Sequence, residues 1–352
     1  MDFSGIKARS SVQKQIRSFF SSRGYLEVET PILSPGVIPE APIELFETGY
    51  IDGEGGERPL YMLPSPELYM KKLLAEGSGD IFQLIRSFRN GEESGPMHNP
   101  EFTMLEWYTT KADYHDSIRT AEELFLSLVE LAEAESFKVR SGGRPPTARS
   151  SSATAAAERL RPPFRTMSVN DAFIRYAGVD LLENQNRKSL LKTVEGRGLS
   201  RPSPEESWEQ LFNRLLLGYV EPSLPKDSPT VLYDYPAQIP AIAKRCRKGP
   251  WIERWELYLG EVEIANCYSE ETDPERVRSF CEREYAAKAA DARVVPDMDE
   301  EFLSLFDANR NDLPSFPDCS GTALGVDRLV MLLTGQASLE GVILFPFSDI
   351  LR

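Results

Sequence analysis

Two glutamates in the run RWELYLGEVEIANCYSEETD are placed to bind a divalent cation. Glu256 and Glu263 stand seven residues apart, on two predicted adjacent strands that meet at Gly260. Hard divalent ions that bridge phosphates prefer carboxylate oxygens and usually take one or two of them from protein. We therefore expect both carboxylates to converge on one cation. For either glutamate alone, a solvated charge at a strand edge is the simpler interpretation.

A second acidic set is suited to hold the ammonium groups of a substrate. Its carboxylates are those of Glu67, Glu106 and Glu270. The expected hydrogen-bonding partners are Tyr108 and Asn266. Several buried carboxylates are tolerated only where cations compensate their charge. A diamine substrate together with a magnesium ion would provide that compensation.

A predicted β-hairpin carries an arginine at its mouth, where a cation can meet a phosphate. Residues 82–89 read as a buried strand that ends at Arg89, residues 91–96 supply turn chemistry, and residues 102–108 return as a second strand. A surface hairpin with a salt-bridged arginine is the alternative on composition alone. Neither GxGxxG nor GxxxxGK[ST] opens a helix in this chain, so a nucleotide would have to be held without a glycine loop.

Three segments resemble, in order, the signature motifs of class II lysyl-tRNA synthetases. The first is GYLEVETPILSP at residues 24–35, preceded by a predicted helix over residues 6–20. The second runs from FRN to HNPEFTMLEWY, and the third is CSGTALGVDRLVMLLTG at residues 319–335. The resemblance implies that the first motif builds the interface of a homodimer. By pattern alone, the third segment would be a buried helix with Asp327 at its N-terminus.

The resemblance assigns the ATP contacts. Arg89 would hold the α-phosphate and Arg328 the γ-phosphate, which makes these two the candidate catalytic residues, and Phe102 would stack on adenine. The other expected ATP contacts are Asn90, His98, Gly325 and Glu256. The same resemblance assigns a magnesium ion to Glu256 and Glu263. The loop GEESGPM departs from the family, because it has seven residues where six are expected. Gly91 also stands where the synthetases carry a glutamate that faces adenine. Glu92 or Glu93 is the expected substitute for that glutamate.

With the segments PSPELYM and EVEIANCYSE, the chain is similar to the lysyl-tRNA synthetase paralogues that modify elongation factor P. This resemblance implies an α+β fold, a class II antiparallel sheet flanked by helices. It also implies ATP-dependent transfer of (R)-β-lysine, through an acyl-adenylate, to a lysine of elongation factor P. The expected substrate contacts are Ser65, Glu67, Glu106, Tyr108, Asn266, Glu270 and Ala323.

Ala323 bears on the choice between lysine and β-lysine. It stands where lysyl-tRNA synthetases carry glycine, so its methyl group would crowd an α-amino group more than a β-amino group. A small residue needed only for strand packing is the alternative. No histidine-centred mechanism is expected, because the chain has only His98 and His115, and His115 is predicted to lie at the surface.

By length and composition, the chain could form one large domain or two equally well. The resemblance implies a single catalytic domain over residues 1–352, and we expect the chain to lie in the cytoplasm without a membrane span. No stretch approaches the ~20 apolar residues of a membrane helix, and the start has no apolar signal region. We expect the chain to lack the anticodon-binding domain of lysyl-tRNA synthetases. This expectation and the net charge of −15 argue against stable tRNA binding. The four cysteines show no CxxC pairing and are expected to be reduced packing residues.

The stretch from residue 141 to 163 is rich in Ser, Ala, Arg and Pro, which predicts a flexible insertion before a helical region over residues 169–217. A basic arm is the alternative, although no aromatic residues interleave to stack on bases. Two other functions stay open. One is a tRNA-independent α-lysine ligase with another acceptor, and the other is a non-catalytic regulator that would have lost its phosphate-binding positions.

Overall fold

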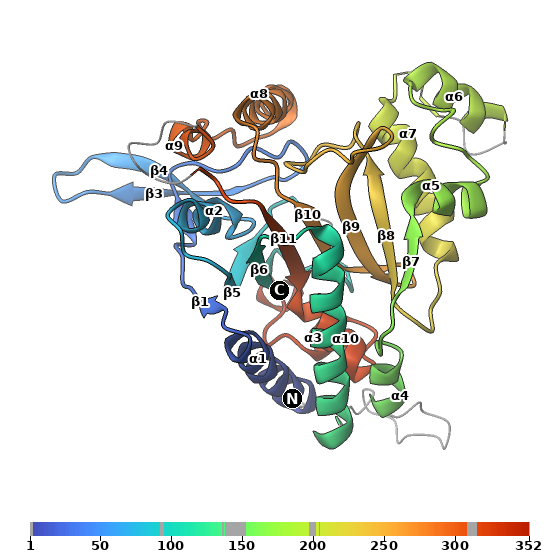
Figure 1. Ribbon diagram of the computed structural model, residues 1–352. Coiled ribbons are helices and arrows are strands. Elements are labelled where there is room, and N and C mark those ends of the chain that lie inside the picture. The colour runs from blue at the N-terminus through green and yellow to red at the C-terminus, as the bar shows by residue number, and fades with distance from the viewer. Residues whose placement is uncertain are drawn as a thin grey trace.

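The computed structural model of the chain describes residues 3–91, 95–135, 137, 153–196, 202–203, 205–307 and 315–351. Its centre is an eight-stranded sheet in the order β1-β5-β6-β11-β10-β9-β8-β7 (Figure 1). The bounds in that order are Leu26–Glu27, Ile81–Phe88, Glu101–Thr110, Cys319–Gly325, Val262–Ser269, Trp251–Leu259, Thr230–Pro236 and Arg165–Ser168. The expected α+β class with an antiparallel sheet is confirmed, except that the outermost strands β1 and β7 pair in parallel with their neighbours.

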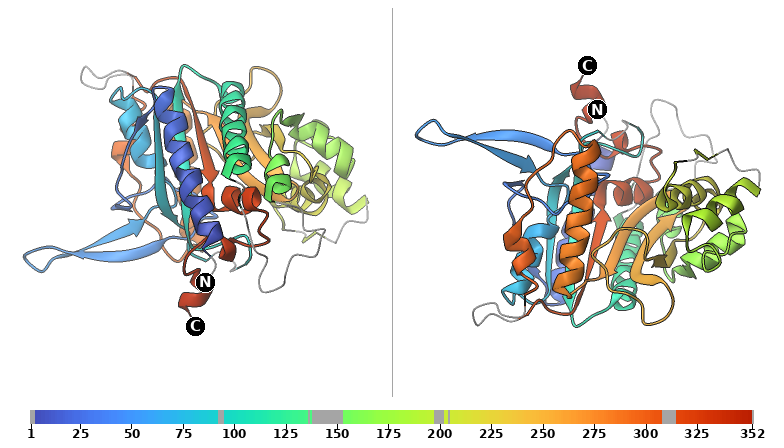
Figure 2. Two further views of the ribbon diagram at one scale, coloured as in Figure 1. Left: turned by 90° about the horizontal axis from the view of Figure 1, so that it is seen from below. Right: turned by 90° about the horizontal axis from the view of Figure 1, so that it is seen from above.

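Helices α1 (Ser4–Ser22), α3 (Tyr114–Glu135) and α10 (Val326–Thr334) pack on one face of the sheet, and α8 (Pro274–Asp291) lies on the other (Figure 2). The predicted helix over residues 6–20 is confirmed as α1. Its residues Val12, Ile16 and Phe20 are buried at helical spacing, so one apolar stripe faces the sheet. Phe20 stacks on Phe82 of β5 with ring centres 5.0 Å apart.

The predicted hairpin and the predicted strand pair are both confirmed. β5 and β6 pair antiparallel from Ile81 opposite Tyr108 to Phe88 opposite Glu101. β9 and β10 meet at Gly260, whose φ of +59° favours glycine. β11 lies between β6 and β10, so segments far apart in the chain become neighbours in the sheet.

A smaller sheet, β2 (Leu33–Ser34), β4 (Glu57–Met62) and β3 (Phe46–Ile51), ends in a hairpin that projects from the body (Figure 1). Helix α2 (Glu67–Ala75) follows it in the chain, and α9 (Glu300–Ser304) follows α8. The chain ends with η4 (Leu339–Gly341) and α11 (Phe347–Ile350).

The predicted helical region over residues 169–217 is also present. Its elements are α5 (Val169–Ala172), η1 (Phe173–Ala177), α6 (Arg187–Gly196), α7 (Trp208–Leu215) and η2 (Leu216–Val220), with η3 (Glu221–Ser223) directly after them. These elements form a second core against β8, in which Phe173 and Phe212 stack with ring centres 4.7 Å apart.

The flexible insertion predicted for residues 141–163 needs correction over its second half. Residues 141–152 lie outside the described residues, but α4 (Ala153–Glu158) is a helix, and Ala157 and Leu160 are fully buried in the main core. Small side chains allow this close packing: a Cβ on Gly335 would lie 3.1 Å from that of Ala156. The linker interpretation therefore does not apply to residues 153–163.

Two smaller expectations are met. Cys267, Cys281 and Cys319 are buried, as expected for packing residues, and Cys246 is half-buried. His115 is exposed at the start of α3. Among the described residues, no helix has the length and apolar character needed to cross a membrane.

Candidate active site

Two connected cavities lie on the α8 side of the sheet. The first, here called the arginine cavity, is lined by Arg89, His98, Phe102, Glu263, Gly325 and Arg328 among others. The second, the acid cavity, is lined by residues that include Glu40, Ser65, Glu67, Glu106, Tyr108 and Glu270. Arg89, Met104, Asn266 and Ala323 line both, so the two cavities meet at these side chains.

Strand register explains why distant residues meet here. Across β10, β11 and β6, Asn266 lies opposite Ala323, which lies opposite Glu106. Two residues further along the same strands, Gly321 lies opposite Tyr108. Because side chains of a strand alternate between faces, residues two apart share one face, and these rows form the floor between the cavities.

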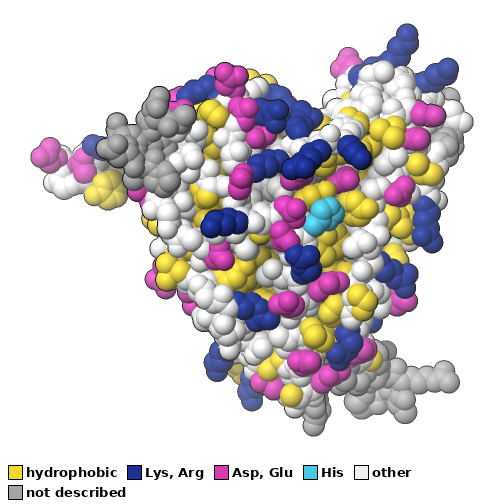
Figure 3. All heavy atoms as spheres, in the orientation of Figure 1, with side chains coloured by type: hydrophobic (Ala, Val, Ile, Leu, Met, Phe, Trp, Pro, Cys, Tyr) yellow, Lys and Arg dark blue, Asp and Glu magenta, His cyan; other side chains and the backbone are white. Residues whose placement is uncertain are grey.

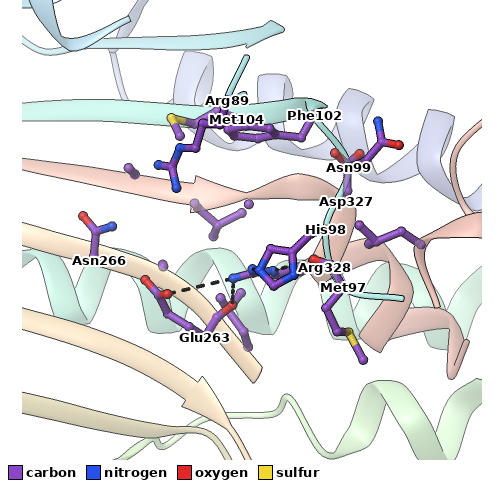
Figure 4. A pocket seen from close by; sticks show the side chains of 16 residues that line it. Arg89, Met97, His98, Asn99, Phe102, Met104, Glu263, Asn266, Asp327 and Arg328 are labelled. Atoms are coloured by element: carbon purple, nitrogen blue, oxygen red, sulfur yellow. Dashed lines mark hydrogen bonds and ion pairs between the residues drawn. The ribbon is translucent and has the colours of Figure 1, made fainter. Parts of the chain in front are cut away.

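Arg328 stands in the first turn of α10 and joins three segments of the arginine cavity (Figure 4). Its guanidinium donates to the backbone oxygen of Glu263 at 3.0 Å, and its Nη2 lies 2.9 Å from Nε2 of His98. The Glu263 carboxylate is 3.9 Å from Nη1. The guanidinium of Arg328 therefore lies inside the cavity, between the hairpin loop and β10.

Arg89 directly follows β5 and directs its guanidinium into the cavity (Figure 4). The backbone nitrogen of Arg89 donates to the oxygen of Pro100 at 3.0 Å, which extends the strand pairing to the start of the hairpin loop. The guanidinium carbon lies 5.4 Å from the centre of the Phe102 ring. A planar cation and an aromatic face side by side suit a phosphate and a base of one nucleotide.

A buried ion pair fixes the start of α10. Asp327 pairs with Arg9 of α1, and its other oxygen accepts from the backbone nitrogen of Thr103 at 2.7 Å. Arg9 also donates to the Thr103 hydroxyl at 2.6 Å. These bonds tie α1, β6 and α10 together, so Asp327 is a scaffold residue that orients the neighbouring Arg328.

The acid cavity contains a cation of its own. Lys71 is fully buried on α2, with Nζ 2.5 Å from Glu67 Oε1 and 2.8 Å from Glu270 Oε2. Burial alone would lower the pKa of Lys71, but the two carboxylates outweigh burial and raise it. Burial raises the pKa of Glu270 to about 7, although Lys71 opposes this rise. The sequence interpretation missed Lys71, which stands one helical turn after Glu67.

The far end of the acid cavity offers an unused acceptor. Tyr108 donates its hydroxyl to Glu106 Oε1 at 2.7 Å, whereas Glu106 Oε2 is buried without a hydrogen bond from the described residues. Burial, followed by the nearby Glu67 carboxylate, raises the pKa of Glu106. Gly321 leaves room for the neighbouring side chains of Glu270 and Tyr108, because a Cβ at this position would lie 2.3 Å from Glu270 Oε1.

Glu256 and Glu263 lie on adjacent strands, as predicted, but only Glu263 lines the arginine cavity. Glu256 accepts from the Tyr235 hydroxyl at 2.6 Å and from Tyr258, and it pairs with Arg254 at 2.5 Å. Its charge still reaches Glu263, whose pKa is raised by burial and then by Glu256.

This pair is compatible with a magnesium site that relies on further oxygen ligands. No group of three or more His, Cys, Asp and Glu side chains among the described residues could hold a metal ion. Two neighbouring carboxylates nevertheless match Mg²⁺, which takes one or two from protein and the rest from phosphates and water. A divalent cation would also relieve the repulsion between the two carboxylates.

Most of the predicted site residues line the two cavities; Asn90 and Glu256 do not. Asn90 turns away, and its side-chain nitrogen donates to the oxygen of Leu45 at 3.3 Å, so it holds a loop in place. Gly91 has a φ of +71°, and the expected substitutes Glu92 and Glu93 lie outside the described residues. The sequence interpretation also missed Glu40, which lies outside the three motifs, and Gly321, which lies in the third motif but has no side chain to suggest a contact.

Comparisons with known proteins identify the family of the chain. Residues 3–349 match the family described as tRNA synthetases class II (D, K and N). Curated relatives named elongation factor P–(R)-β-lysine ligase include those of Sodalis glossinidius, Klebsiella pneumoniae and Yersinia enterocolitica. They are 34%, 35% and 36% identical to the chain over 339, 340 and 342 residues. Each alignment covers 96% of this chain and 93% of the relative.

Proposed function

The chain belongs to the class II tRNA synthetases of the D, K and N type, and from this premise we propose that it is an ATP-dependent ligase. Its proposed reaction activates (R)-β-lysine as an adenylate and transfers it to a lysine side chain of elongation factor P. The observation that carries the proposal is the junction of the two cavities at Arg89, Asn266 and Ala323. A diamine held in the acid cavity would place its carboxylate beside a nucleotide held in the arginine cavity.

The acid cavity suits a substrate with two ammonium groups. The free Oε2 of Glu106 and the Tyr108 hydroxyl can bind one ammonium, and Glu67, which lines the same cavity, is available for the second one. Lys71 balances part of the acidic charge, and the substrate supplies the remainder. A neutral or acidic amino acid would leave buried carboxylates uncompensated, which is unfavourable.

The arginine cavity suits ATP. Phe102 offers a ring for the adenine, Arg89 is placed for the α-phosphate, and Arg328 is placed for the γ-phosphate. Glu263, with Glu256 behind it, would hold magnesium, which when bound neutralises phosphate charge and helps pyrophosphate to leave.

The proposed reaction has two steps and needs no covalent enzyme intermediate. In the first, the substrate carboxylate attacks the α-phosphorus, an acyl-adenylate forms, and pyrophosphate leaves. Arg89 and Arg328 stabilise the charge that develops on the phosphoryl oxygens. In the second, the amine of a protein lysine attacks the adenylate carbonyl and displaces AMP. Rate enhancement then comes mainly from positioning and electrostatics.

Pyrophosphate exchange tests the proposal directly. We expect exchange with β-lysine in the absence of tRNA, followed by a mass increase of elongation factor P by one β-lysyl group in the full reaction. Exchange that requires tRNA would contradict it.

The two alternatives give different results in this experiment. A stand-alone α-lysine ligase would exchange best with α-lysine and leave elongation factor P unmodified. A non-catalytic regulator would show no exchange. The intact positions Arg89, Arg328 and Glu263 favour activity.

A further inference from the structure

Glu40 is a carboxylate of the acid cavity that the proposed mechanism does not use. It lies in the loop between β2 and β3 and lines the cavity together with Arg89 and Glu67. The backbone around it is held by α8: Lys288 donates to the oxygen of Glu40 at 3.2 Å, and Glu284 accepts from the nitrogen of Ala41 at 3.1 Å. The loop is therefore fixed, with the Glu40 side chain in the lining of the acid cavity.

Glu40 differs from the other acidic residues of the cavities, because its carboxylate has no hydrogen-bond or ion-pair partner among the described residues. Glu67 and Glu270 pair with Lys71, and Glu106 accepts from Tyr108. The Glu40 carboxylate makes no hydrogen bond or ion pair with the described residues, and the residue is only half-buried. Glu40 can therefore exchange a proton with a group that enters the cavity.

We propose that Glu40 is the general base that deprotonates the acceptor amine in the transfer step. This inference rests on the proposed function. A protein lysine has an ordinary pKa near 10.4, so it arrives as an ammonium ion that has no lone pair for attack. Glu40 and Arg89 line the same cavity, and Arg89 is placed for the phosphate that the carbonyl carries, so the Glu40 carboxylate would meet this ammonium on the side of the adenylate.

Proton transfer precedes bond formation in the proposed step. The acceptor ammonium gives one proton to the Glu40 carboxylate and becomes a neutral amine. The amine nitrogen forms a bond with the adenylate carbonyl carbon, and the bond between that carbon and the phosphate oxygen breaks, so AMP leaves with the electron pair. The second amine proton goes to water as the tetrahedral intermediate collapses. Glu40 then returns its proton to solvent.

The charges around Glu40 suit a base that works near neutral pH. Burial and the Glu67 carboxylate on α2 raise the pKa of Glu40 to about 7, with a further contribution from Glu284 on α8. Arg89 at the end of β5 and Lys288 on α8 oppose this rise. A base is most effective when its pKa lies near the working pH. Since Glu40 is ionised above about pH 7, the transfer rate should increase through this pH and then level off.

Glu40→Gln separates the two half-reactions. Adenylate formation is followed by pyrophosphate exchange, and transfer is followed in a single turnover from preformed adenylate to elongation factor P. We expect transfer at pH 7.5 to fall by about 100-fold, the usual size of a general-base contribution, and to lose its rise near pH 7. The KM for β-lysine in exchange should change by less than about twofold, since the base acts after activation.

Two further variants control the experiment. Glu40→Asp should keep a pH-dependent transfer at an intermediate rate, because it retains a carboxylate. Glu47→Gln changes an exposed glutamate on β3, outside both cavities, and should behave as the wild type.

The outcomes are distinguishable. A large increase in the KM for β-lysine in Glu40→Gln would make Glu40 a ligand of the substrate ammonium and overturn the inference. So would a transfer rate within about threefold of wild type, or an unchanged pH profile. Failure of the wild-type protein itself to exchange pyrophosphate or to modify elongation factor P would instead reject the proposed function.

Discussion

At the scale of single residues, Lys71 compensates the negative charge of the acid cavity before a substrate binds. Glu67 and Glu270 both contact its ammonium group, and Lys71 and Glu270 are buried while Glu67 is half-buried. An ion pair in such a place contributes little net stability, but removing one partner leaves the others buried and uncompensated. Lys71 therefore has a structural role that a ligand-binding motif would not reveal.

Lys71→Met tests this role. We expect the free energy of unfolding to fall by about 3–5 kcal/mol, because the buried Glu270 and the half-buried Glu67 lose their cation. Urea denaturation followed by circular dichroism would measure the loss. The neighbouring Lys72→Met is the matched control: Lys72 pairs with Asp299 and Glu301 near the surface, so its loss should stay below ~1 kcal/mol. Equal losses in both variants would show that Lys71 is not a compensating charge.

Glu263→Gln tests the magnesium assignment. Removing the negative charge should lower pyrophosphate exchange by at least about 100-fold at fixed Mg²⁺, because the metal loses the one acidic ligand of the pair that lines the cavity. The fold should persist, since the amide keeps the shape of the side chain, and the thermal midpoint would verify this. Exchange close to the wild-type rate would exclude Glu263 as a metal ligand.

Ala323→Gly tests the choice of amino acid. Ala323 lies between Asn266 and Glu106 in the sheet and lines both cavities, so its methyl group borders the reacting end of the substrate. A difference of one carbon in a pocket typically contributes about 1–3 kcal/mol. We expect the variant to raise kcat/KM for α-lysine relative to β-lysine. Exchange kinetics on both isomers would decide, and an unchanged ratio in a folded variant would assign Ala323 to strand packing alone.

At the scale of elements, sequence patterns predicted what is local and missed what depends on distant partners. The β5–β6 hairpin and helix α1 were predictable because turn residues and apolar spacing lie within one short segment. The order of the strands was not predicted, because pairing of β11 between β6 and β10 joins residues far apart in the chain. Helix α4 was missed because its burial depends on the surface that α10 offers.

This correction changes the expected effect of altering the insertion. Replacing residues 141–152 by a Gly/Ser linker of equal length should leave pyrophosphate exchange unchanged, because these residues carry almost no apolar surface for a core. Leu160→Ala should instead reduce the free energy of unfolding by about 2–5 kcal/mol, since Leu160 is fully buried. Urea titrations and exchange assays on both variants would measure this. Loss of exchange in a folded linker variant would place residues 141–152 in the active site.

At the scale of the whole molecule, the net charge bears on which partners can bind, and the motif residues bear on which ligands the cavities can hold. The net charge of −15 disfavours polyanions in general, and Figure 3 shows acidic and basic side chains interspersed on the face seen in Figure 1. The resemblance predicted most of the cavity lining, because motif residues mark ligands. Glu40 and Lys71 were not predictable in the same way, since each acts through neighbours from other parts of the fold.

The last prediction concerns the oligomeric state, for which the resemblance implies a homodimer built on the first motif. Leu26, Ile32 and Leu33 of that segment are 55%, 39% and 38% exposed in the single chain, and a partner subunit would cover this apolar surface. Light scattering after size exclusion should give twice the chain mass of 39.6 kDa. Leu26→Glu combined with Leu33→Glu should shift the protein to a monomer, because charges would be buried at the interface. Leu217→Glu changes a leucine of η2 that is 61% exposed and lies outside the first motif, and this variant should stay dimeric. A wild-type monomer, or a double variant that remains dimeric, would show that this segment does not form the interface.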